Sequence, residues 1–144
     1  MDFKYIATLL GNLSGVPVRV YQNGEQVFYH SLIEFPKDPF ELYKDEIFSK
    51  SDNVSYFIAP TTHYFGAVKS KDVLLIIGPA RQMDVDEQTL RNLSFELDVP
   101  INKVDDFISG MKRLGVLPLE SLLQILFSFS HLLNGDKLSL KDVI

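Results

Sequence analysis

Hydrophobic positions along the 144-residue chain recur with two different periods, and the changes between them mark out helices and strands. Residues 2–13 carry apolar side chains at helical spacing. Residues 16–22 alternate apolar and polar positions, as a strand exposed on one side does, and residues 26–31 are rich in Val, Phe and Tyr, which favour a return strand. Asn23-Gly24 lies between them, and this dipeptide favours a tight hairpin because both central residues of that turn need a positive φ. The first part of the chain therefore predicts a helix followed by a β-hairpin.

The middle of the chain predicts a second helix and then a group of short strands. Pro39 suits a first helical turn, and an apolar stripe continues to about residue 50. Residues 54–60, 64–69 and 73–78 are strand-like. The links between these strands are too short for helical crossovers, so we expect antiparallel neighbours. Because the last strand is apolar on both faces, we expect helices on both sides of the sheet.

The remainder of the chain predicts helices separated by Pro100 and by the stretch 115–118, and the last helix covers residues 119–133. The complete order is helix, hairpin, helix, three-strand meander and helices. Its simplest arrangement is an α/β (α+β) fold in which a five-stranded antiparallel sheet is flanked by helices. PAS and GAF sensor domains share this plan, so the fold is PAS/GAF-like by analogy.

Charge and composition restrict the partners of this domain. The net charge is −5 and the 14 Lys and Arg residues form no run, so the domain itself should not bind DNA. The absence of cysteine excludes disulfides, thiolate zinc sites and cysteine nucleophiles, and it fits a reducing, cytoplasmic location. The longest apolar segment is broken by polar residues, so we expect no membrane span.

Catalytic chemistry is not indicated by the remaining polar residues. His30, His63 and His131 fall on a predicted strand, a loop and a helix, without the spacing of metal ligands. The paired carboxylates lie at predicted helix starts or on solvated helical faces, where the helix dipole explains those at the starts. We therefore expect no catalytic residue, no metal and no cofactor, and a protein that is not an enzyme. A small enzyme that uses the acidic clusters is the alternative.

The three-strand meander offers a candidate ligand site. Tyr56 and Tyr64 have the same parity across a tight turn, Gly66 would leave space beside them, and Arg81 follows the end of the neighbouring strand. An apolar pocket with a few polar groups is the usual form of a small-molecule site. The alternative interpretation is that both tyrosines are core residues whose hydroxyl groups are satisfied within the chain.

The helix predicted over 119–133 offers a candidate dimer interface. Its apolar residues include a 3-4-3-4 series that is typical of a coiled-coil seam. We assign this seam to Leu119, Leu122, Leu126, Phe129 and Leu133. Ile6 and Leu10 of the first helix would join the same bundle in a homodimer. Packing within one chain is the competing explanation.

Several stretches of the chain resemble the N-terminal sensor domains of Firmicute AraC-type transcriptional regulators. They are Leu13-Ser-Gly-Val-Pro-Val-Arg-Val-Tyr21, Phe35-Pro-Lys-Asp-Pro39, Asn53-Val-Ser-Tyr-Phe57, Ile76-Ile-Gly-Pro79 and Leu132-Leu-Asn-Gly-Asp-Lys-Leu138. The resemblance covers most of the chain and consists of general sequence texture without catalytic signatures. It implies a regulatory domain that binds a small-molecule effector or dimerises, ahead of a helix-turn-helix module that would contact DNA.

This resemblance suggests a division of the chain. Residues 1–135 would form the sensor and dimerisation domain, and residues 136–144 would begin a linker toward the DNA-binding module. Ser139 and Asp142 have the spacing of a helix start, which indicates that a further helix begins there. A short tail docked on the domain is the alternative for this segment. A structural dimerisation domain without a ligand is the alternative for the function.

Overall fold

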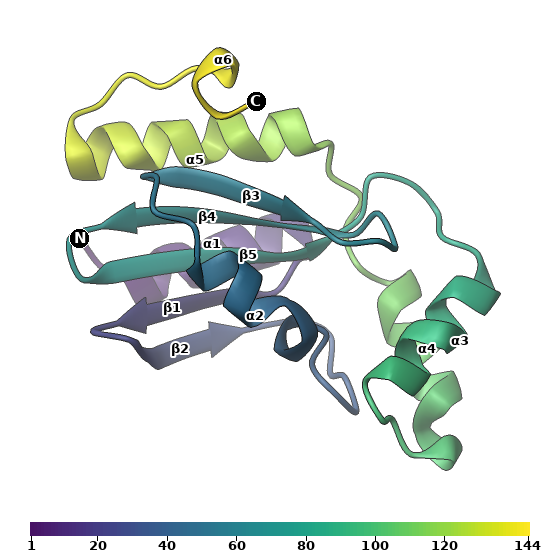
Figure 1. Cartoon of the computed structure of the whole chain (residues 1–144). Coiled ribbons are helices and arrows are strands. Elements are labelled where there is room, and N and C mark those ends of the chain that lie inside the picture. Colours follow the sequence, from purple (N-terminus) through teal and green to yellow (C-terminus); the bar gives the residue numbers. More distant parts are fainter.

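An open antiparallel sheet organises the chain in the computed structural model, which describes residues 1–144 (Figure 1). Its strands lie in the order β2-β1-β5-β4-β3, so the first and last strands pair at the centre. They are β1 (Val18–Gln22), β2 (Glu25–His30), β3 (Val54–Ile58), β4 (Tyr64–Ser70) and β5 (Val73–Ala80). The predicted α+β fold with a five-stranded antiparallel sheet is confirmed.

The helices lie where the periodicity predicts them, with ends displaced by a few residues. They are α1 (Phe3–Ser14), α2 (Phe40–Phe48), α3 (Glu87–Glu96), α4 (Val104–Lys112), α5 (Leu119–Asn134) and α6 (Leu140–Val143). A short 3₁₀ turn, Ile101–Lys103, precedes α4. Gly135 ends α5 in the left-handed conformation at φ 75°, which glycine adopts without a steric penalty.

One face of the sheet is covered by α1 and α5. Val18 and Val20 of β1 and Leu75 of β5 point to this face and are buried beneath the two helices. Leu122 and Leu126 of α5 are buried in the same cluster. Figure 1 shows the chain turning back after α5 so that α6 lies beside this helix, and Leu140 and Val143 of α6 pack against the same core.

The opposite face of the sheet is covered by α2. Phe40 and Ile47 of this helix pack against Phe65, Ala67 and Ile76 of the central strands, and all five are buried. Helices therefore cover both faces, as the apolar character of β5 predicts.

Helices α3 and α4 form a separate core beside one end of the sheet (Figure 1). Leu93 of α3 and Phe107 of α4 are buried there, together with Ile33 from the loop between β2 and α2. We call residues 113–118, which return from α4 to α5, the strap. The N–H of Leu117 in the strap donates to the carbonyl of Arg81 at 2.9 Å.

Glycine at position 115 allows the strap to touch α1. The N–H of Gly115 donates to the carbonyl of Gly15 at 3.0 Å. A Cβ atom at Gly115 would lie 1.9 Å from the carbonyl oxygen of Ser14, so only glycine permits this approach. The strap is therefore packed directly on the sheet-and-α1 body.

Candidate functional site

The meander residues predicted to bind a ligand are occupied by the chain's own packing. Tyr64 is fully buried, and its hydroxyl donates to the carbonyl of Leu117 at 2.6 Å. Burial raises the pKa of this phenol. A Cβ atom at Gly66 would lie 2.9 Å from Leu122 Cδ2 and from Leu126 Cδ1. The expectation that Gly66 leaves space for a ligand is wrong, because two leucines of α5 fill that space.

The side chains of Arg81 and Tyr56 have different surroundings and do not line a common pocket. Arg81 donates from Nε to the carbonyl of Leu114 at 2.7 Å and forms an ion pair with Asp84 at 2.7 Å. Tyr56 is half-buried on β3 and lines a shallow groove that Val143 of α6 also borders. Arg81 and Tyr64 both donate hydrogen bonds to carbonyl groups of the strap, so their side chains position the strap.

The predicted dimer seam is largely part of the single-chain core. Leu10, Leu122 and Leu126 are buried against the sheet of their own chain. Their assignment to a dimer interface is therefore wrong, because these side chains are not accessible to a second subunit. The other seam residues are half-buried against the same core: Ile6, Leu119, Phe129 and Leu133. Packing within one chain accounts for the apolar character of α5.

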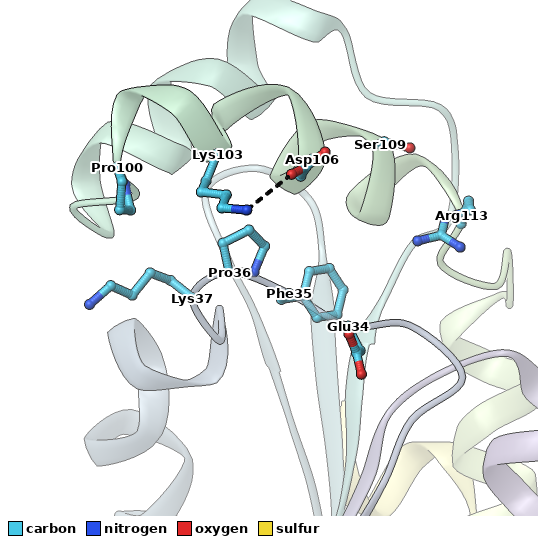
Figure 2. A pocket seen from close by; sticks show the side chains of 9 residues that line it. All are labelled: Glu34, Phe35, Pro36, Lys37, Pro100, Lys103, Asp106, Ser109 and Arg113. Carbon is cyan, nitrogen blue, oxygen red and sulfur yellow. Dashed lines mark ion pairs between the residues drawn. The ribbon is translucent and has the colours of Figure 1, made fainter.

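A cleft of about 600 Å³ lies between the β2–α2 loop and the α4 region (Figure 2). The loop supplies one wall, from residues 34–37, and the 3₁₀ turn and α4 supply the other. The lining residues are Glu34, Phe35, Pro36, Lys37, Pro100, Lys103, Asp106, Ser109 and Arg113. This volume falls within the range of small-molecule sites in proteins. The cleft therefore lies where the loop from the sheet meets the α3–α4 body.

A second hollow of about 420 Å³ adjoins the cleft on the other side of the loop. Glu34 and Phe35 line both cavities, so this part of the loop forms the partition between them. The Phe35 ring packs against Phe107 of α4 with centroids 6.2 Å apart. Gly110 of α4 allows this contact, since a Cβ atom there would lie 3.2 Å from Cε1 of Phe35. The partition is therefore seated on α4.

A buried ion pair fixes the end of the same loop to the sheet. Arg19 of β1 is 2% exposed, and its guanidinium contacts both carboxylate oxygens of Asp38, at 2.8 and 3.3 Å. The guanidinium lies between two rings, 4.1 Å from the centroid of Phe40 and 4.7 Å from that of Tyr29. Asp38 Oδ1 also accepts a hydrogen bond from the N–H of Phe40 at 3.0 Å. The loop wall of the cleft is thus tied to both β1 and α2.

Polar side chains also fix the C-terminal segment. Asp136 Oδ2 accepts hydrogen bonds from Ser130 at 2.7 Å and from Asn53 at 3.0 Å, while its Oδ1 is buried without a partner. Leu138, Leu140 and Val143 pack against the core beneath α5. Residues 136–144 therefore contact the domain, and α6 carries the predicted capping box.

Buried His63 sits in the turn between β3 and β4, in an environment that disfavours its charged form. Its Nδ1 hydrogen-bonds with the hydroxyl of Thr61 at 2.7 Å, and its Nε2 is buried without a partner. Burial, with a smaller contribution from the nearby Arg81 charge, lowers the pKa of His63 to about 4.

No group of three or more His, Asp or Glu residues is placed to hold a metal ion. None of the helices has the length and apolar character needed to cross a bilayer.

Sequence reasoning did not identify the cleft because its two walls are more than sixty residues apart in the chain. The stretch Phe35–Pro39 stood out only as part of the resemblance to sensor domains. Nothing in the spacing of Lys103, Ser109 and Arg113 indicated a common site. No protein-family model matches the chain, and neither the curated proteins nor the solved structures contain a significant match to it.

Proposed function

We propose that this chain is the effector-sensing domain of a bacterial AraC-type transcription regulator and that the effector binds in the cleft between the β2–α2 loop and α4. The main support for the proposal is the cleft itself, which has about 600 Å³ of space between the β2–α2 loop and the α3–α4 body. The strand order is compatible with a PAS/GAF-like plan. The resemblance to AraC-type sensor domains supports the regulatory role.

The strap supplies a route from the cleft to the C-terminal segment. Arg113 lines the cleft and is also the first residue of the strap. The next carbonyls along the strap are held by the sheet, since Leu114 accepts from Arg81 and Leu117 accepts from Tyr64. Helix α5 begins immediately after the strap and leads to the docked segment 136–144. If a ligand binds better when α4 occupies one of two positions relative to the loop, it raises the population of that position. The strap would then carry the shift to α5 and to residues 136–144.

Homodimerisation, a cytoplasmic location and a following DNA-binding module stay predictions from the sequence and its resemblance. The net charge of −5 assigns any DNA contact to that other module. A structural dimerisation domain that binds no ligand is the rival function, and a mass measurement in solution together with a ligand screen separates the two.

A thermal-shift screen against sugars, amino acids and nucleotide metabolites tests the proposal. A ligand at one hundred times its Kd adds roughly 2.7 kcal/mol to the free energy of unfolding, which raises the melting temperature by several degrees. We expect Ser109→Trp, which fills the cleft, to abolish the shift. Ser128→Trp places the same side chain on an exposed position of α5 and should preserve it.

Two outcomes would contradict the proposal. A screen without any hit, combined with a dimeric mass, favours the structural dimerisation domain. If a ligand still raises the melting temperature of Ser109→Trp, it binds elsewhere on the molecule, and the cleft is not the effector site.

A further inference from the structure

We infer that the cleft selects a small anion with an apolar or aromatic body, such as an aryl or alkyl carboxylate or phosphate; this inference rests on the proposed function of the cleft. Its strongest support is that one of the four arginines, Arg113, has no carboxylate partner. Three of them have a carboxylate partner, since Arg19 pairs with Asp38, Arg81 with Asp84, and Arg91 with two acids. Arg113 has neither an ion pair nor a side-chain hydrogen bond, and it lines the cleft.

The charges around Arg113 leave the cleft positive. Lys103 forms a long ion pair with Asp106 at 3.9 Å, and the lining cations Lys37, Lys103 and Arg113 outnumber the lining acids Glu34 and Asp106. Figure 2 shows the guanidinium of Arg113 turned toward Phe35 and the ammonium of Lys103 above Pro36, whereas the carboxylate of Glu34 points away from Arg113. This local excess of cations stands out in a chain whose net charge is −5.

The space between these cations has an apolar floor. The ring of Phe35 and the ring of Pro36 form the loop wall, and Pro100 stands at the far side of the cleft (Figure 2). A flat apolar group can lie on this floor while its charged end reaches Arg113. The planar guanidinium then offers two parallel N–H donors to a carboxylate or phosphate, a geometry that an ammonium group cannot match.

A matched ligand series tests this selectivity. The probes are phenylacetate, phenylacetamide and 2-phenylethylamine, which share a phenyl ring and differ in charge, titrated into the isotope-labelled chain and followed by amide chemical shifts. We expect phenylacetate to shift signals of Phe35, Ser109 and Arg113 and to bind about tenfold more tightly than phenylacetamide. We expect Arg113→Gln to remove that tenfold preference and to leave phenylacetamide binding unchanged. Lys4→Gln makes the same loss of charge on α1 and should change nothing.

The outcomes separate this inference from the proposed function. Binding of phenylacetamide or 2-phenylethylamine in the cleft as tightly as phenylacetate overturns the anion selectivity and leaves the cleft as a ligand site. A preference for phenylacetate that persists in Arg113→Gln also overturns the inference. If none of the three probes shifts the cleft signals, the inference of anion selectivity fails, whereas the proposed function is decided separately by the thermal-shift screen.

Discussion

Replacing Asp38 with alanine should destabilise the fold strongly, because it leaves the buried charge of Arg19 without its counter-ion. Removal of one partner from a buried ion pair costs about 3–5 kcal/mol, and the 29% exposure of Asp38 favours the lower end of that range. The substitution also removes the acceptor for the N–H of Phe40 at the start of α2, which adds about 1 kcal/mol. We therefore expect a loss of about 4 kcal/mol, a large share of the typical stability of a domain.

Two matched variants show whether this explanation is correct. Asp38→Asn keeps an acceptor for Phe40 but leaves the Arg19 charge unpaired, so it should lose about 3 kcal/mol. Arg19→Met removes the buried charge itself and should cost about 2 kcal/mol, mainly from the lost contacts with the rings of Tyr29 and Phe40. Urea unfolding followed by circular dichroism at 25 °C gives each free energy. A cost for Arg19→Met equal to or larger than that for Asp38→Ala would refute the reasoning.

Three further predictions concern other parts of the fold. Gly66→Ala should lower the free energy of unfolding by about 1–3 kcal/mol, measured by the same urea titration, because the new Cβ atom meets α5 at 2.9 Å. Because the pKa of His63 is lowered in the folded chain, the unfolded chain binds a proton at higher pH than the folded one does. The free energy of unfolding should therefore be full above about pH 6.5 and fall by up to about 3 kcal/mol as the pH approaches about 4. His63→Asn should flatten that pH dependence. Asp136→Ala should speed amide hydrogen exchange in residues 138–143 at least tenfold, without a comparable change in the central strands. Equal exchange in this variant and in the unsubstituted chain would show that other contacts hold the segment.

The elements of the fold could be predicted from the sequence because each has a local signal. Asn23-Gly24 has positive φ values of 54° and 80° in the hairpin turn, as its type requires. The apolar run in β5 reports a central strand covered on both faces. Ser139 and Asp142 form the capping box that their spacing predicts.

The candidate site could not be predicted in the same way because it depends on contacts between distant segments. Parity correctly placed Tyr56 and Tyr64 on one face of the sheet, but it does not report which helix covers that face. Once α5 lies on Gly66, the apparent space is a close helix–sheet contact. The seam on α5 was read as an interface for the same reason, since a buried helix and a dimerisation helix share one apolar pattern.

Some polar residues have roles that no local pattern announces. Arg19 follows the alternation expected for an exposed position of β1, yet it is buried beneath Phe40 and paired with Asp38. Arg81 was expected to contact a ligand because it follows the end of a strand, and it instead holds the strap through Leu114. In both residues the guanidinium bonds to a segment distant in the sequence, Asp38 for Arg19 and Leu114 for Arg81.

Hydrogen exchange of the chain, with and without a saturating ligand from the thermal-shift screen, shows whether the cleft binds the effector and whether binding changes the strap and the C-terminal segment. We predict slower exchange in residues 33–37 and 103–113, which form the two walls of the cleft, together with a change in the strap and in residues 136–143. Protection confined to the sheet around Tyr56 and Gly66, or protection of the cleft walls with no change in the strap and the C-terminal segment, would contradict the account.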